Sequence, residues 1–171
     1  MQLIIGNKNY SSWSLRGWLA VKASGLPFEE VVIPLRRDDT KTRILAFSPS
    51  GKVPCLIEHG LAIWDSLAIA EYLAEVMPSL WPQDASARAL ARSVSAEMHS
   101  GFQALRSQMP MNIRGRFPEH PVSPEVAQDI QRIEAIWNDC RNHFSSGGRY
   151  LFGAYSIADM MFAPVCLRFE T

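Results

Sequence analysis

Hydrophobic residues follow two different spacings in the first 77 residues of the chain. The short apolar run QLIIG predicts a buried strand, and FEEVVIPL, with its β-branched centre, predicts a second strand. Between them, Leu15, Trp18 and Leu19 begin an apolar helical stripe, which Gly25 ends. The other predicted elements are a short helix at 40–47, a hairpin at 55–64 that turns at HG, and a helix at 65–77. The order β-α-β-α-β-β-α predicts a small mixed sheet with helices on its faces.

The rest of the chain shows mainly helical periodicity. Pro82 and its polar neighbours at 79–86, just after Pro78, predict a linker. Apolar residues recur at steps of three and four over 87–109 and again over 126–144, which predicts two long amphipathic helices joined by a proline-rich loop. The expected fold class is therefore α/β plus all-α, with one domain at 1–78, a linker at 79–86 and an all-helical domain at 87–171.

A last helix is predicted over 156–169. Ser156 and Asp159 stand at the spacing of a capping box, with Asp in place of Glu. The apolar residues of this helix need covering, and the helices predicted before it would cover them poorly. We therefore expect the helical domain to be truncated, unless a partner subunit covers this surface.

Composition and charge narrow the class of protein. The chain has 171 residues, with 17 Lys or Arg against 17 Asp or Glu, so it lacks the basic excess that binds nucleic acid or an anionic membrane. Its three cysteines form no C-x-x-C pair, which argues against a disulfide framework or a zinc site. No segment reads as a signal peptide or a membrane span. We expect a cytoplasmic protein that needs no metal, nucleic acid or membrane.

The stretch SGKVPCL places Val53–Pro54 where the chain enters a strand. The simplest interpretation is an ordinary trans proline at a strand start. If the bond is cis, the N–H and C=O of Val53 would point outward and could pair with an extended peptide.

A second stretch, WDSLAIAEYL, puts Asp65 and Ser66 at the start of a helix. Both residue types are common helix caps, which is one interpretation. The other is a ligand site, because a helix N-terminus binds carboxylates. Ser66 would donate to the carboxylate and Asp65 would meet an ammonium group, as in the headgroup of an amino acid.

Ser11 and Ser12 precede the first predicted helix, and here too a cap is one interpretation. The alternative is a hydroxyl that donates to a thiolate held at the helix N-terminus. Lowering a thiol pKa by about two units takes about 2.7 kcal/mol. A charge-assisted hydrogen bond supplies about 1.5–3 kcal/mol and a helix terminus about 0.3–1 kcal/mol, so the two together suffice.

Taken together and in this order, these stretches resemble the glutathione transferase family. SSWSLR resembles the serine motif of the zeta and related classes, SPSGKVPCL the cis-proline loop, and DSLAIAEYL the acidic-residue-plus-serine motif. The resemblance extends over essentially the whole chain. It implies a thioredoxin-like N-terminal domain, an all-helical C-terminal domain and glutathione as co-substrate.

The resemblance also implies roles for individual residues. The γ-glutamyl end of glutathione would bind Asp65 and Ser66, and its cysteinyl backbone would pair with Val53 beside a cis Pro54. Lys52 would contact the glycyl carboxylate. The thiolate would face Ser11 or Ser12, of which the zeta pattern favours Ser11, and the electrophile would lie beside Trp13.

Trp13 stands where zeta members carry a cysteine. This departure argues against disulfide chemistry at the site and weakens the case for maleylacetoacetate isomerisation. We expect a homodimeric glutathione transferase that acts on a small electrophile. The alternatives are a glutathione-dependent cis–trans isomerase and a non-catalytic glutathione-binding module with the same fold.

Overall fold

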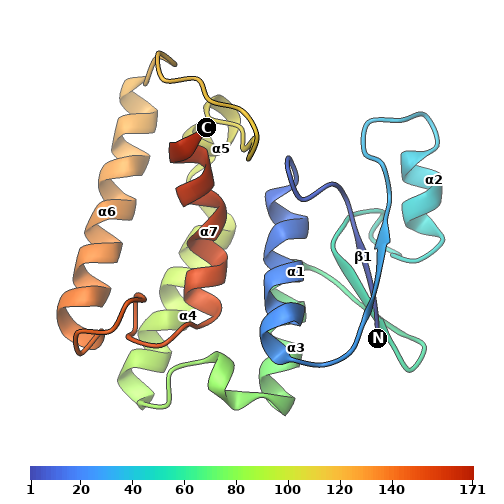
Figure 1. Cartoon of the computed structure of the whole chain (residues 1–171), viewed down its shortest axis with the longest axis horizontal. Coiled ribbons are helices and arrows are strands. Elements are labelled where there is room, and N and C mark those ends of the chain that lie inside the picture. The colour runs from blue at the N-terminus through green and yellow to red at the C-terminus, as the bar shows by residue number, and fades with distance from the viewer. The chain divides into compact units, whose positions relative to one another are not determined.

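The computed structural model describes residues 1–171 (Figure 1). The chain divides into two compact units, Met1–Met77 and Pro78–Thr171. No helix is both long and apolar enough to cross a membrane.

The first unit has the predicted order of strands and helices, β-α-β-α-β-β-α. Its elements are β1 (Gln2–Ile5), α1 (Ser12–Ser24), β2 (Glu29–Val32), α2 (Thr40–Leu45), β3 (Cys55–Glu58), β4 (Leu61–Ile63) and α3 (Ser66–Val76). Gly25 ends α1 in the left-handed conformation, with φ of 70°, as the sequence predicts. The predicted hairpin is also present, with positive φ at both turn residues, His59 and Gly60.

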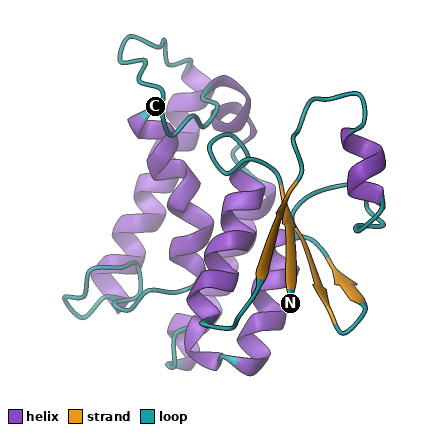
Figure 2. Ribbon diagram, turned by 45° about the vertical axis from the view of Figure 1, so that its right-hand side comes forward, coloured by secondary structure: helices purple, strands orange, loops and turns teal.

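The four strands form one mixed sheet in the order β2-β1-β3-β4. β1 runs parallel to β2 and antiparallel to β3, and β3 runs antiparallel to β4. Helices α1 and α3 pack side by side on one face of the sheet, and α2 covers the other (Figures 1 and 2). Because both faces are covered, the consecutive residues Leu3, Ile4 and Ile5 of β1 are all fully buried.

The second unit is helical. After a short 3₁₀ turn, η1 (Pro78–Leu80), it contains α4 (Ala85–Ser100), α5 (Gln103–Gln108), α6 (Pro124–Phe144) and α7 (Ile157–Glu170). α7 packs against α4, and α5 packs against α6. The predicted capping box of the last helix is present, because Ser156 and Asp159 each bond to the other's backbone N–H.

The prediction of one long helix over 87–109 is wrong, because the helix is interrupted between α4 and α5. Gly101 is extended and Phe102 has a φ of 61°, so neither continues the helix. The guanidinium of Arg106 covers the end of α4 by donating to the carbonyls of Met98, His99 and Gly101. Apolar spacing persists across the break because α5 also turns a buried residue, Leu105, inward.

Candidate active site

The sheet topology brings the three predicted stretches together at one end of the strands. In the antiparallel pairs, Cys55 at the start of β3 lies opposite Ile4 near the end of β1, and Ile63 at the end of β4 lies opposite Leu56. The segments that follow β1 and β4 and the segment that precedes β3 therefore emerge together. These segments carry the predicted residues Ser11, Ser12 and Trp13, then Lys52, Val53 and Pro54, then Asp65 and Ser66.

At the start of α1, Ser11 is the N-cap residue. Its Oγ accepts a hydrogen bond from the Ser14 backbone N–H at 3.3 Å and donates one to Ser14 Oγ at 2.9 Å. Ser14 Oγ also accepts the backbone N–H of Gly6, 2.9 Å away. The capping interpretation of this serine pair is confirmed for Ser11, while Ser12 is the first helical residue and is buried.

The Val53–Pro54 bond is cis, as the resemblance implies. Pro54 is buried against α1 at Gly17, where an added Cβ would lie 2.8 Å from Pro54 Cγ. Because of this close approach, the Lys52–Pro54 loop packs on the same helix that Ser11 caps. Only a residue without a side chain at position 17 allows it.

The backbone of Val53 is available for pairing. Its N–H and C=O take part in no backbone hydrogen bond of the chain, and β3 begins only at Cys55. The preceding residue, Lys52, is exposed. An extended peptide can pair with such groups as it pairs with the edge of a sheet.

At the start of α3, Asp65 caps the helix. Its Oδ1 accepts the backbone N–H groups of Leu67 and Ala68 at 3.0 and 3.3 Å, which confirms the capping interpretation for this residue. Ser66 behaves differently: its side chain is 1% exposed and its Oγ has no hydrogen-bond partner. An unpartnered buried hydroxyl is uncommon, and here it stands at a helix N-terminus, which favours anions.

Trp13 and Arg16 lie together in the first turns of α1. The Arg16 guanidinium carbon is 4.8 Å from the centroid of the Trp13 ring, within cation–π range. Arg16 is buried and Trp13 is half-buried. One face of the Trp13 indole therefore contacts the guanidinium of Arg16, a residue of the same helix.

Two of the three cysteines, Cys55 and Cys140, are buried and carry no reactive thiolate. Cys55 follows Pro54, but its side chain lies in the core with Ile4, Ile33 and Ile44. Burial raises the pKa of the Cys55 thiol, and burial together with nearby Asp139 and Asp159 raises the pKa of the Cys140 thiol to about 11. Both thiols are therefore neutral at physiological pH.

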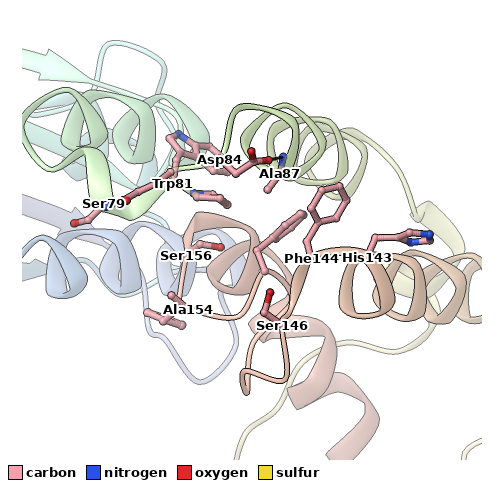
Figure 3. A pocket seen from close by; sticks show the side chains of 13 residues that line it. Ser79, Trp81, Asp84, Ala87, His143, Phe144, Ser146, Ala154 and Ser156 are labelled. Atoms are coloured by element: carbon pink, nitrogen blue, oxygen red, sulfur yellow. Dashed lines mark hydrogen bonds between the residues drawn. The ribbon is translucent and has the colours of Figure 1, made fainter.

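A separate cavity of about 440 Å³ lies within the second unit (Figure 3). Its walls come from residues 79–87, 143–146 and 152–156, and none of the predicted site residues lines it. Two of its polar groups already have structural roles. Asp84 accepts the Ala87 N–H at 2.8 Å (Figure 3), and Ser156 Oγ donates to Asp159 at 3.0 Å. No sequence motif connects the three segments, so the cavity could not be predicted from local patterns.

Sequence comparison identifies the first unit. Residues 10–76 match the family model described as glutathione S-transferase, N-terminal domain. The chain is 37% identical over 161 residues to a probable maleylacetoacetate isomerase of Caenorhabditis elegans, covering 90% of this chain and 72% of that protein. It is 32% identical over 160 residues to the maleylacetoacetate isomerase of Rattus norvegicus, covering 90% and 70%.

Structural comparison agrees over both units. A glutathione transferase homolog from Burkholderia, solved with bound glutathione, matches with a TM-score of 0.68 at 26% identity. The match covers 98% of this chain and 81% of that one. The predicted combination of a thioredoxin-like N-terminal domain and a helical C-terminal part is confirmed. The chain belongs to the glutathione S-transferase family.

Proposed function

We propose that this protein is a glutathione transferase, in which residues 1–78 bind glutathione and stabilise its thiolate for attack on a small electrophile. The observation that carries the proposal is the buried, unpartnered hydroxyl of Ser66 at the N-terminus of α3. Glutathione bound to the similar Burkholderia protein supports the choice of ligand.

The γ-glutamyl end of glutathione carries a carboxylate and an ammonium group on one carbon. Ser66 Oγ donates to the carboxylate, which also meets the positive end of the α3 dipole. Asp65 supplies the opposite charge for the ammonium group while its Oδ1 caps the helix. Two adjacent residues thus distinguish an amino-acid headgroup from a simple acid.

The cysteinyl and glycyl parts of glutathione follow the loop before β3. Val53 pairs its backbone N–H and C=O with those of the cysteinyl residue, because no backbone group of the chain uses them. Lys52, exposed on the same loop, meets the glycyl carboxylate. In this arrangement the sulfur faces the start of α1, and the packing of Pro54 on that helix at Gly17 supports it.

The thiolate accepts a hydrogen bond from Ser11 or Ser12. Accessibility favours Ser11, which is half-buried, whereas Ser12 is 6% exposed. The hydroxyl and the helix terminus lower the pKa of the glutathione thiol, whose proton passes to solvent. The sulfur then bonds to an electrophilic carbon beside Trp13, and the leaving group departs with its electron pair.

The alternative is a cis–trans isomerase that uses glutathione as a cofactor. The similarity to two maleylacetoacetate isomerases, at 37% and 32% identity, favours it. In that reaction the thiolate adds to a cis double bond, the resulting single bond rotates, and expulsion of the sulfur regenerates glutathione. Trp13, in place of a cysteine, alters the wall next to the sulfur in either reaction.

Two substrates separate these reactions. Turnover of a chlorinated aromatic electrophile by the unmutated protein, lost in Ser11→Ala or in Ser12→Ala, supports the transferase. Turnover of maleylacetone with no consumption of glutathione supports the isomerase instead. If the protein binds glutathione but turns over neither substrate, it is a non-catalytic binding module. The homodimer, expected from the family, and the cytoplasmic location, expected from the cysteine content, stay predictions.

A further inference from the structure

We infer that Ser14 is a positioning residue for the thiolate, acting through the hydroxyl of Ser11. This inference rests on the proposed function and on the choice of Ser11. Nothing in the resemblance or the comparisons assigns a role to this serine.

The geometry places Ser14 at the centre of a small buried network. Its side chain is fully buried, and its Oγ accepts two hydrogen bonds of 2.9 Å, from the Gly6 backbone N–H and from Ser11 Oγ. Its backbone N–H donates to Ser11 Oγ at 3.3 Å. Gly6 directly follows β1, so the network connects the sheet to the first turn of α1.

This network decides where the Ser11 proton points. A hydroxyl has one proton, and in the structure Ser11 donates it to Ser14. Ser11 can donate to a sulfur anion only when that hydrogen bond reverses. In the reversed arrangement Ser14 donates to Ser11 Oγ, and Ser11 donates to the sulfur.

The reversal needs only the rotation of two hydroxyl groups. The 2.9 Å separation of the two oxygens suits a hydrogen bond in either direction, and no proton changes its oxygen. The Gly6 N–H stays on Ser14 Oγ throughout and makes that hydroxyl a stronger donor. Because Ser14 is fully buried, water does not replace its hydroxyl when the side chain is removed.

The test compares Ser14→Ala, Ser11→Ala and the double variant with the unmutated protein. Ser24→Ala is the matched control, because Ser24 is also buried on α1 and donates to the Val21 carbonyl at 2.7 Å. Carbon-13 NMR of glutathione labelled at its cysteinyl Cβ gives the pKa of the bound thiol. Calorimetry compares glutathione with S-methylglutathione, which has no thiolate.

We expect Ser14→Ala to raise the pKa of the bound thiol by about 0.5–1 unit, which corresponds to a factor of about 3–10 in thiolate stabilisation. The affinity of Ser14→Ala for S-methylglutathione should stay within about twofold of the unmutated protein's. A structural defect would weaken the binding of both ligands, whereas loss of positioning weakens only the binding of the thiolate. The double variant matches Ser11→Ala, and Ser24→Ala matches the unmutated protein.

Other results overturn the inference. An unchanged thiol pKa in Ser14→Ala would do so, as would additive effects of the two substitutions. If Ser14→Ala does not fold, Ser14→Cys keeps the shape of the side chain with a slightly larger atom that hydrogen-bonds only weakly, and an unchanged pKa of the glutathione thiol there is equally decisive. If the unmutated protein binds no glutathione, the proposed function fails as well. If it binds normally and Ser11→Ala has no effect, only the role of the Ser11–Ser14 pair is lost.

Discussion

Gly17 of α1 lies against the ring of Pro54, so closely that an added Cβ would be 2.8 Å from Cγ and 2.9 Å from Cβ of the proline. This contact joins the helix capped by Ser11 to the loop that carries Val53. Two of the three parts of the proposed glutathione site are therefore held together by one glycine and one proline.

Gly17→Ala should weaken the site. The added methyl forces the Lys52–Pro54 loop away from α1, which should lower the free energy of unfolding by about 1–3 kcal/mol and glutathione affinity by about tenfold. Calorimetry and chemical denaturation measure both effects. Gly25→Ala is the control, since a Cβ there meets open space at a φ of 70°. It should lower stability by about 1 kcal/mol and leave glutathione affinity unchanged.

Ser66→Ala should change stability and affinity in opposite directions. Its Oγ is buried and unpartnered, so removing it relieves a desolvation penalty and should raise the free energy of unfolding by about 1 kcal/mol. Glutathione affinity should fall by about tenfold or more, because a hydrogen bond to a carboxylate is lost. Ser95, in α4, is also buried with an unpartnered Oγ, so Ser95→Ala should gain stability without losing affinity. Equal affinity in the two variants would contradict the role given to Ser66.

Two substitutions at Asp65 separate its two roles. Asp65→Ala removes the cap of α3 and should cost about 1 kcal/mol of stability as well as affinity. Asp65→Asn keeps an oxygen for the Leu67 and Ala68 N–H groups, so stability should hold while glutathione affinity falls. Asp84→Ala, which removes the equivalent cap of α4, should reduce stability alone. Thermal unfolding and calorimetry on the same samples test this, and normal binding by Asp65→Asn would refute a charge role.

Stability should depend on pH through Cys140. Its pKa is raised from 9.0 to about 11, chiefly by burial, so the thiol ionises earlier in the unfolded chain than in the folded one. The stability that this residue contributes is therefore complete below about pH 9 and is lost as the pH rises toward 11. The gap in unfolding free energy between the unmutated protein and Cys140→Ala should narrow over that range. A constant gap in urea denaturation from pH 8 to pH 11 would exclude this account.

Local signals in the sequence were sufficient for much of the fold. His59-Gly60 predicts the hairpin because both residues adopt positive φ, and Ser156 and Asp159 predict the start of α7 because their spacing matches the hydrogen bonds they make. The same reasoning placed caps at Ser11 and Asp65. In each case, neighbours in sequence form the contact.

Other features depend on groups that lie far apart in the sequence. The break at Gly101–Phe102 was not predicted, because the apolar stripe continues into α5 while Arg106 covers the end of α4 from the following turn. The network at Ser14 depends on Gly6, eight residues earlier. The Ser66 hydroxyl lacks a hydrogen-bond partner because of the residues packed around it. No local sequence pattern predicts that packing.

Calorimetric titration of the chain with glutathione tests the proposed glutathione site. We predict binding at one site per chain, weakened by about tenfold or more in Ser66→Ala and unchanged in Ser95→Ala. If the folded, unmutated protein releases or absorbs no heat with millimolar glutathione, it has no such site.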